Sequence, residues 1–193
     1  TEYGADGNLA LKWSTDPAEK IADQAYIRFD LGAMGIDAPT RLTSAAFEIA
    51  LRDVSTGHSD KVFRVYALND ELDGWDESLI TWNNAPGKPG DYNAGDRILN
   101  GTGTLLGTFT APEYDDTMKA KLPDTYLFAD PLLLSHLQTH LGSDGLITLV
   151  LTTATDTSRN DIFAANEHAT VAPPKLRLTY DSSAPAGTVI VVR

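Results

Sequence analysis

The sequence predicts an all-β protein of the sandwich type with one short helix. Most of the chain consists of short, partly apolar segments separated by residues that favour turns. Helical spacing between start and stop signals occurs in one segment alone, and 193 residues is the size of a single domain. We expect a β-sandwich over residues 1–181, a linker over 182–187 and a final strand over 188–193.

The alternation of polar and apolar residues defines the expected strands. In residues 25–31, Tyr26, Arg28 and Asp30 alternate with apolar residues, so this strand should bury one face. Similar patterns give about nine or ten strands in all. Apart from the final strand, they are 9–13, 25–31, 44–51, 61–68, 105–109, 126–129, 146–153, 161–164 and 175–180.

One helix is expected over residues 131–141. Asp130 is a favourable N-cap, Pro131 suits the first helical position, and Gly142 follows the end. The leucines of this segment recur at helical spacing and form an apolar stripe that could cover one end of the sandwich.

Two segments stand apart from the regular strands. Residues 83–104 are rich in glycine and proline, which predicts a long surface loop of the kind that often carries function. The final strand is apolar on both faces and is therefore suited to being covered on both sides. Its apolar residues are Val189, Ile190, Val191 and Val192.

Charge and composition exclude several classes of partner. The chain has 15 basic and 27 acidic residues, and its net charge of −12 argues against nucleic acids and anionic membranes. No apolar run is long enough to span a bilayer, so membrane insertion is not expected. The chain contains no cysteine, which excludes disulfides and thiolate metal sites.

No catalytic residue is predicted. Motifs for a serine nucleophile, a phosphate-binding loop or a dinucleotide site are missing from the sequence. His136 and His140 have the spacing of two metal ligands on a helix, but no third ligand or neighbouring base accompanies them, so they are better explained as a polar helix face. We expect no enzyme activity and no cofactor.

Two sets of residues are candidates for binding. Asp70, Glu71 and Asp73 lie in a crowded acidic segment and could hold a calcium ion, although solvation of the surface explains them as well. Aromatic rings pack against the apolar face of sugars, and the same rings also cover the ends of cores. The first candidates for glycan contact are Trp75, Trp82 and Tyr92.

The stretch Gly74 to Pro86, with the sequence GWDESLITWNNAP, resembles the signature of extracellular DNRLRE domains, a group that includes carbohydrate-binding module family 96. Residues 3–9, 25–31, 44–47 and 173–180 are also similar to parts of this family. The resemblance implies a secreted or surface-attached sandwich of jelly-roll type without catalysis. It also implies a frequent association with polysaccharide-degrading enzymes and, in some members, alginate binding.

The chain departs from this family in two respects. Members normally carry a first strand before the Tyr3-Gly4 turn, so an edge strand of this jelly roll is expected to be missing. The strand 188–193 is an addition after the usual end of the family. The acidic balance is also unfavourable for alginate, because its carboxylates would be repelled, so alginate binding is not expected here.

Two functions from different classes are compatible with these features. The first is a structural subunit that forms an extracellular homopolymer, in which residues 188–193 of one copy complete the sheet of the next. In a variant of this arrangement, residues 188–193 complete the sheet of their own subunit. The second is an extracellular or cell-surface module that binds a neutral or weakly charged polysaccharide through a sheet face or through the 83–104 loop.

Overall fold

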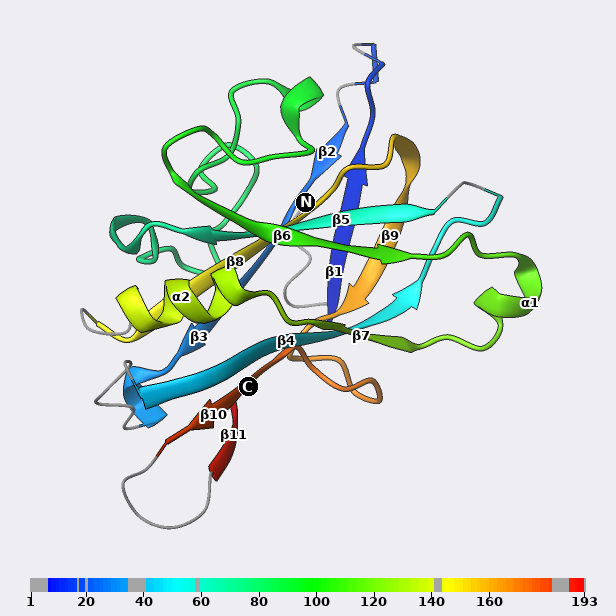
Figure 1. Ribbon diagram of the computed structural model, residues 1–193. Coiled ribbons are helices and arrows are strands. Elements are labelled where there is room, and N and C mark those ends of the chain that lie inside the picture. The colour runs from blue at the N-terminus through cyan, green and yellow to red at the C-terminus, as the bar shows by residue number, and fades with distance from the viewer. Residues whose placement is uncertain are drawn as a thin grey trace.

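The computed structural model describes residues 7–16, 18–19, 21–34, 41–57, 60–140, 144–181 and 188–192. Its strands form two antiparallel sheets, which confirms the predicted all-β sandwich (Figure 1). The seven-stranded sheet has the order β11-β10-β4-β9-β1-β2, and β7 also pairs with β4. The four-stranded sheet has the order β3-β8-β5-β6.

The bounds of the elements follow. The larger sheet contains β1 (Asn8–Trp13), β2 (Ala22–Asp23), β4 (Leu42–Asp53), β7 (Asp124–Phe128), β9 (Thr157–Ala164), β10 (Lys175–Tyr180) and β11 (Thr188–Val192). The smaller sheet contains β3 (Ala25–Asp30), β5 (Lys61–Leu68), β6 (Gly103–Ala111) and β8 (Leu146–Thr153). The helices are α1 (Asp116–Lys119), α2 (Pro131–His140) and the 3-10 turns η2 (Gly32–Met34), η4 (Asp70–Leu72) and η5 (Tyr92–Ala94).

The main core lies between the two sheets, where the alternation seen in the sequence places the apolar residues. In β3, Ala25, Ile27 and Phe29 are buried, whereas Tyr26 and Arg28 point to the opposite face. Phe63 of β5 meets Phe163 of β9 edge to face across the core, with ring centroids 5.1 Å apart. This inner layer contributes most of the apolar burial that stabilises the fold.

A second apolar cluster lies on the outer face of the four-stranded sheet. It contains Tyr66 and Leu68 of β5, Val150 of β8 and Ile98 of the segment between β5 and β6. Strand β8 is consequently buried on both faces, which explains its nearly continuous apolar sequence. The β5–β6 segment therefore covers a sheet face that would otherwise expose apolar residues to water.

Helix α2 covers part of the sandwich beside β4 and β6, as the leucine stripe predicts. Leu133 and Leu137 are fully buried in the main core. The Asp130 side chain accepts a hydrogen bond from the Leu132 amide at 2.8 Å, so it acts near the helix start as expected for an N-cap. No helix in the part of the chain that the structure describes is long and apolar enough to cross a membrane.

The structure differs from the sequence-based elements in several places. Strand β2 has two residues and α1 four, which is too short for a periodic pattern to form, so neither was predicted. Strands β4, β6 and β9 extend beyond their predicted ends, because pairing with neighbouring strands continues where the alternation is weaker. The linker 182–187 lies outside the described residues.

The C-terminal strand pairs within its own chain. β11 runs antiparallel to β10, with Thr188 opposite Tyr180 and Val192 opposite Leu176. Strand β11 is therefore the last strand of the seven-stranded sheet, at the end opposite β2. Whether residues 188–193 can also pair with another copy, as the sequence predicts, stays a prediction.

A buried ion pair joins the two sheets. Lys61 of β5 and Asp161 of β9 are 1% and 0% exposed, and the Lys61 ammonium lies 3.5 Å from the Asp161 carboxylate. The same ammonium donates a hydrogen bond to the Ser55 hydroxyl at 2.9 Å. Such a pair depends on both partners, since either charge alone would be buried without compensation.

We therefore predict that Lys61→Met destabilises the protein by about 3–5 kcal/mol, because it leaves the Asp161 carboxylate buried without its cation. The double variant Lys61→Met/Asp161→Leu should recover most of this loss. Urea unfolding followed by intrinsic fluorescence measures both free energies of unfolding. The prediction is wrong if the single variant is as stable as the double variant.

Candidate functional site

A cleft opens at the edge of the sandwich where β1 and β2 face β3. The third wall of the cleft comes from the part of the β5–β6 segment that contains both Trp75 and Trp82. The free space in the cleft, including the part that is open to solvent, is about 820 Å³. The polar side chains that line it are Asn8, Asp23, Gln24, Glu77 and Thr81.

A second hollow lies next to the cleft and follows β3. Leu9, Tyr26, Trp75 and Glu77 line both spaces, so the two hollows are neighbours, and together they are called the depression below. The second hollow is also lined by Arg28 of β3 and by residues 165–167, which follow β9. On this side β3 pairs with no strand among the described residues, so the edge of the smaller sheet is open. Two neighbouring hollows suit an extended ligand.

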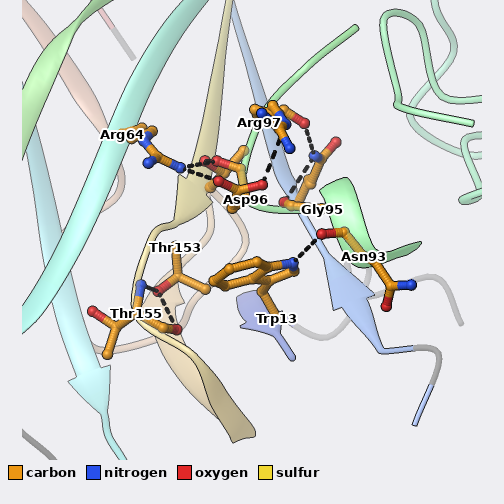
Figure 2. A network of polar contacts seen from close by, with 10 residues as sticks. Trp13, Arg64, Asn93, Gly95, Asp96, Arg97, Thr153 and Thr155 are labelled. Atoms are coloured by element: carbon orange, nitrogen blue, oxygen red, sulfur yellow. Dashed lines mark hydrogen bonds and ion pairs between the residues drawn. The ribbon is translucent and has the colours of Figure 1, made fainter. Parts of the chain in front are cut away.

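The β5–β6 segment is anchored to both sheets, which fixes the wall it contributes. The Trp13 indole of β1 donates a hydrogen bond to the Asn93 carbonyl at 3.0 Å (Figure 2). The Asp96 carbonyl accepts hydrogen bonds from Arg64 at 2.7 Å and from Thr152 at 2.6 Å. A Cβ atom on Gly95 would lie 2.2 Å from the Cβ of Ala22, so the close approach of this segment to β2 requires glycine.

Trp75 is held in place between two residues of β3 and one residue of β8. Its indole nitrogen donates a hydrogen bond to the Thr148 hydroxyl at 2.9 Å, and its ring meets Tyr26 edge to face at a centroid distance of 6.0 Å. The Arg28 guanidinium lies 4.8 Å from the ring centroid and donates hydrogen bonds to the carbonyls of Asp73 and Trp75. Trp75 is therefore half-buried and rigidly positioned.

Trp82 and Tyr92, both proposed from the sequence, are in contact with each other. Their rings are stacked at a centroid distance of 5.1 Å and an angle of 13°. The Lys88 ammonium lies 5.9 Å from the centroid of the Trp82 ring. Trp82 lines the cleft, whereas Tyr92 supports Trp82. The structure thus brings Trp75 and Trp82 to one cleft and places Tyr92 behind them.

The acidic residues proposed for calcium have different environments. Glu71 is exposed in η4, whereas Asp73 is 1% exposed. The pKa of Asp73 is raised to about 6, chiefly by burial and also by the charges of Asp144 and Asp70, while a hydrogen bond from Thr148 and the charge of Arg28 partly oppose the shift. Among the described residues, no group of three His, Cys, Asp or Glu side chains is placed to hold a metal ion.

Neither of the two histidines whose side chains are described, His136 and His168, lines the cleft. His168 accepts a hydrogen bond from the Val171 amide at 2.9 Å and so supports a turn. His136 is half-buried on α2, whereas the side chain of His140 and all of His58 lie outside the described residues. The polar-face interpretation of the helix histidines therefore stays a prediction.

Sequence reasoning missed the residues that β1, β2 and β3 contribute to the cleft. Asn8, Asp23, Gln24 and Tyr26 lie in or next to short strands, where their residue types carry no functional signal. Tyr26 offered one clue, since it is an aromatic residue at an outward position of an alternating strand. Its contact with Trp75 could be seen only in the three-dimensional structure.

Comparison with known proteins gives one result. The model of carbohydrate-binding module family 96 matches residues 1–97, which is half of the 193-residue chain. The matched part contains β1 to β5 and most of the β5–β6 segment, including every residue that lines the first part of the cleft. A search of curated proteins found no match.

The raised pKa of Asp73 predicts a pH dependence of stability. Because its pKa is about 6 when folded and near 3.8 when exposed, the folded state loses stability as the pH rises from about 4 to about 6. The loss is up to about 3 kcal/mol. We predict that the Asp73→Asn variant does not show this decrease in the free energy of unfolding between about pH 4 and pH 6. Urea unfolding at several pH values measures it.

The control is Glu113→Gln, because Glu113 is exposed and its substitution changes the net charge by the same amount. Its stability should follow the wild-type curve. An Asp73→Asn variant with the wild-type pH profile would contradict the prediction.

Proposed function

Because the chain belongs to carbohydrate-binding module family 96, we propose that it is a non-catalytic module that binds a polysaccharide in the cleft between β1–β2 and β3. The observation that carries this proposal is the presence of Trp75 and Trp82 in one cleft together with several polar side chains. Aromatic faces attract the apolar face of a sugar ring, and polar groups orient its hydroxyls. Family membership further supports an extracellular or surface location.

The binding mode follows from the shape of the cleft and the placement of its aromatic residues. Trp75 lines both halves of the depression, whereas Trp82 lines the first half alone. We place one sugar at each tryptophan and the continuing chain along β3. Lys88 has a flexible side chain, so a sugar that stacks on Trp82 displaces its ammonium from the ring.

This arrangement favours the binding of a glycan. Both aromatic residues are held by contacts that exist without a ligand, so little ordering is needed when a glycan binds. We assign the acidic residues that line the depression, Asp23, Glu77 and Glu167, to recognition of the glycan.

We predict that Trp82→Ala lowers the affinity for a bound neutral polysaccharide by roughly tenfold, because the stacking surface is lost. Affinity electrophoresis in gels that contain soluble glucan, xylan or mannan measures this change. Leu127→Ala is the matched control, since Leu127 is 58% exposed on β7 and does not line the cleft.

Melting temperatures must first show that both variants are folded. The proposal fails if folded Trp82→Ala and Trp75→Phe variants both retain wild-type affinity for every glycan that the protein binds. It also fails if the wild-type protein binds none of a broad panel of polysaccharides.

A specific feature of β11 favours a second proposal, self-assembly by strand exchange. β11 ends the seven-stranded sheet, pairs with β10 alone among the described strands, and its sequence contains no charged residue. Uncharged edge strands are prone to pair with other chains. We propose that β11 of one copy can take the same place beside β10 of the next copy, which would link copies into a polymer.

We predict that the purified chain forms concentration-dependent polymers and that deletion of residues 186–193 abolishes them. Light scattering and analytical ultracentrifugation of both proteins measure their size. Polymers that persist undiminished after the deletion would refute strand exchange. A wild-type chain that stays monomeric at high concentration would show that β11 serves its own subunit.

A further inference from the structure

The charges that line the depression are mostly negative. Asp23 of β2 and Glu77 of the β5–β6 segment line the first half, and Glu167 lines the second half. Among the residues that line it, one cation accompanies them, Arg28 of β3. A carboxylated sugar would therefore meet three carboxylates and one guanidinium.

Arg28 is already engaged and is poorly placed to compensate an anionic ligand. Its guanidinium donates hydrogen bonds to the carbonyls of Asp73 and Trp75 and lies over the Trp75 ring. Releasing it for a ligand carboxylate would break the contacts that position Trp75. The local field of the depression is thus set by its acidic residues.

Asp23 lines the cleft and can accept a hydrogen bond from a ligand. It is half-buried on β2 and has no hydrogen-bond donor to its carboxylate among the described residues. Burial raises its pKa, although the charge of Lys12, directly opposite on β1, partly opposes this shift. A positively charged donor that entered the cleft would supply the hydrogen bond that no described donor gives to this carboxylate.

The surroundings of Trp82 also favour a positively charged ligand. The Lys88 ammonium lies over this ring, which indicates that the electron-rich face attracts a cation at that point. A protonated amino group on a sugar can take the place of Lys88 while its pyranose ring packs against Trp82. The ring of Trp82 therefore favours a positive charge at this position of the first half.

From these observations we infer, on the basis of the proposed glycan binding, that the cleft selects a polysaccharide whose sugars carry free amino groups. Asp23 and Glu77 are the specificity-determining residues, because their carboxylates accept charge-assisted hydrogen bonds from the sugar ammonium. The same carboxylates exclude uronic acids. Neutral sugars bind through the aromatic residues and through hydrogen bonds without charge assistance, and therefore more weakly.

The test compares three soluble oligosaccharides of equal length by calorimetry, at a pH at which the sugar amines are protonated. They are an oligomer of glucosamine, its fully N-acetylated counterpart and an oligomer of a uronic acid. We expect the glucosamine oligomer to bind about tenfold more tightly than the N-acetylated one, because charge-assisted hydrogen bonds are about twice as strong as neutral ones. The uronic acid oligomer should show no binding.

Substitutions separate recognition in the cleft from general attraction to an acidic protein. Asp23→Asn should lower the ratio of the two affinities, and the double variant Asp23→Asn/Glu77→Gln should bring it close to one. Glu113→Gln removes one negative charge from an exposed site that does not line the depression and should leave this ratio unchanged. If Glu113→Gln lowers the ratio as much as Asp23→Asn does, the preference arises from the net charge and the inference is overturned.

The remaining outcomes distinguish this inference from the proposed function. Equal affinities for the glucosamine and N-acetylated oligomers would overturn the inference and leave glycan binding intact. Tight binding of the uronic acid oligomer would overturn the inference in the same way. Failure of every oligosaccharide and polysaccharide to bind the folded protein would overturn both.

Discussion

The outer face of the four-stranded sheet has to be covered, and the segment between β5 and β6 covers it. Tyr66, Leu68 and Val150 would otherwise expose an apolar patch, and Ile98 packs onto them. Hydrophobic contact alone would let such an irregular segment slide. The Asp96 carbonyl prevents this, since it accepts hydrogen bonds from Arg64 of β5 and Thr152 of β8. The position of this segment determines where Trp75 and Trp82 lie.

The cleft is a consequence of the same arrangement combined with an open edge. β2 ends one sheet and β3 ends the other, and no described strand bridges them. The β5–β6 segment crosses near this opening and is tied to it by Gln24, whose side-chain amide donates hydrogen bonds to the carbonyls of Gly95 and Arg97. The aromatic residues are thus supported by the sheets, which supplies the rigidity that a pre-formed binding surface needs.

The sequence predicted those parts of the fold in which local pattern and burial agree. The alternation in β3 and the capping residues of α2 are local signals, and the structure confirms both elements. The sequence also identified Trp75 and Trp82 as candidates for glycan contact, because aromatic rings pack against the apolar face of sugars. The cleft itself could not be predicted, since it joins strands and a segment that are separated by tens of residues. Nor could the burial of the Asp73 side chain, which contacts Thr148 of β8, a residue far away in the sequence.

The two proposed activities occupy different ends of one sheet. In the order β11-β10-β4-β9-β1-β2, the strand proposed for exchange lies at one end and the strand that lines the cleft lies at the other. Pairing between copies through β11 would therefore leave the cleft accessible. A polymer of such subunits would present many identical clefts, and a polysaccharide could engage several of them at once. Because each additional contact is then intramolecular, modest affinity at a single cleft would suffice for firm attachment.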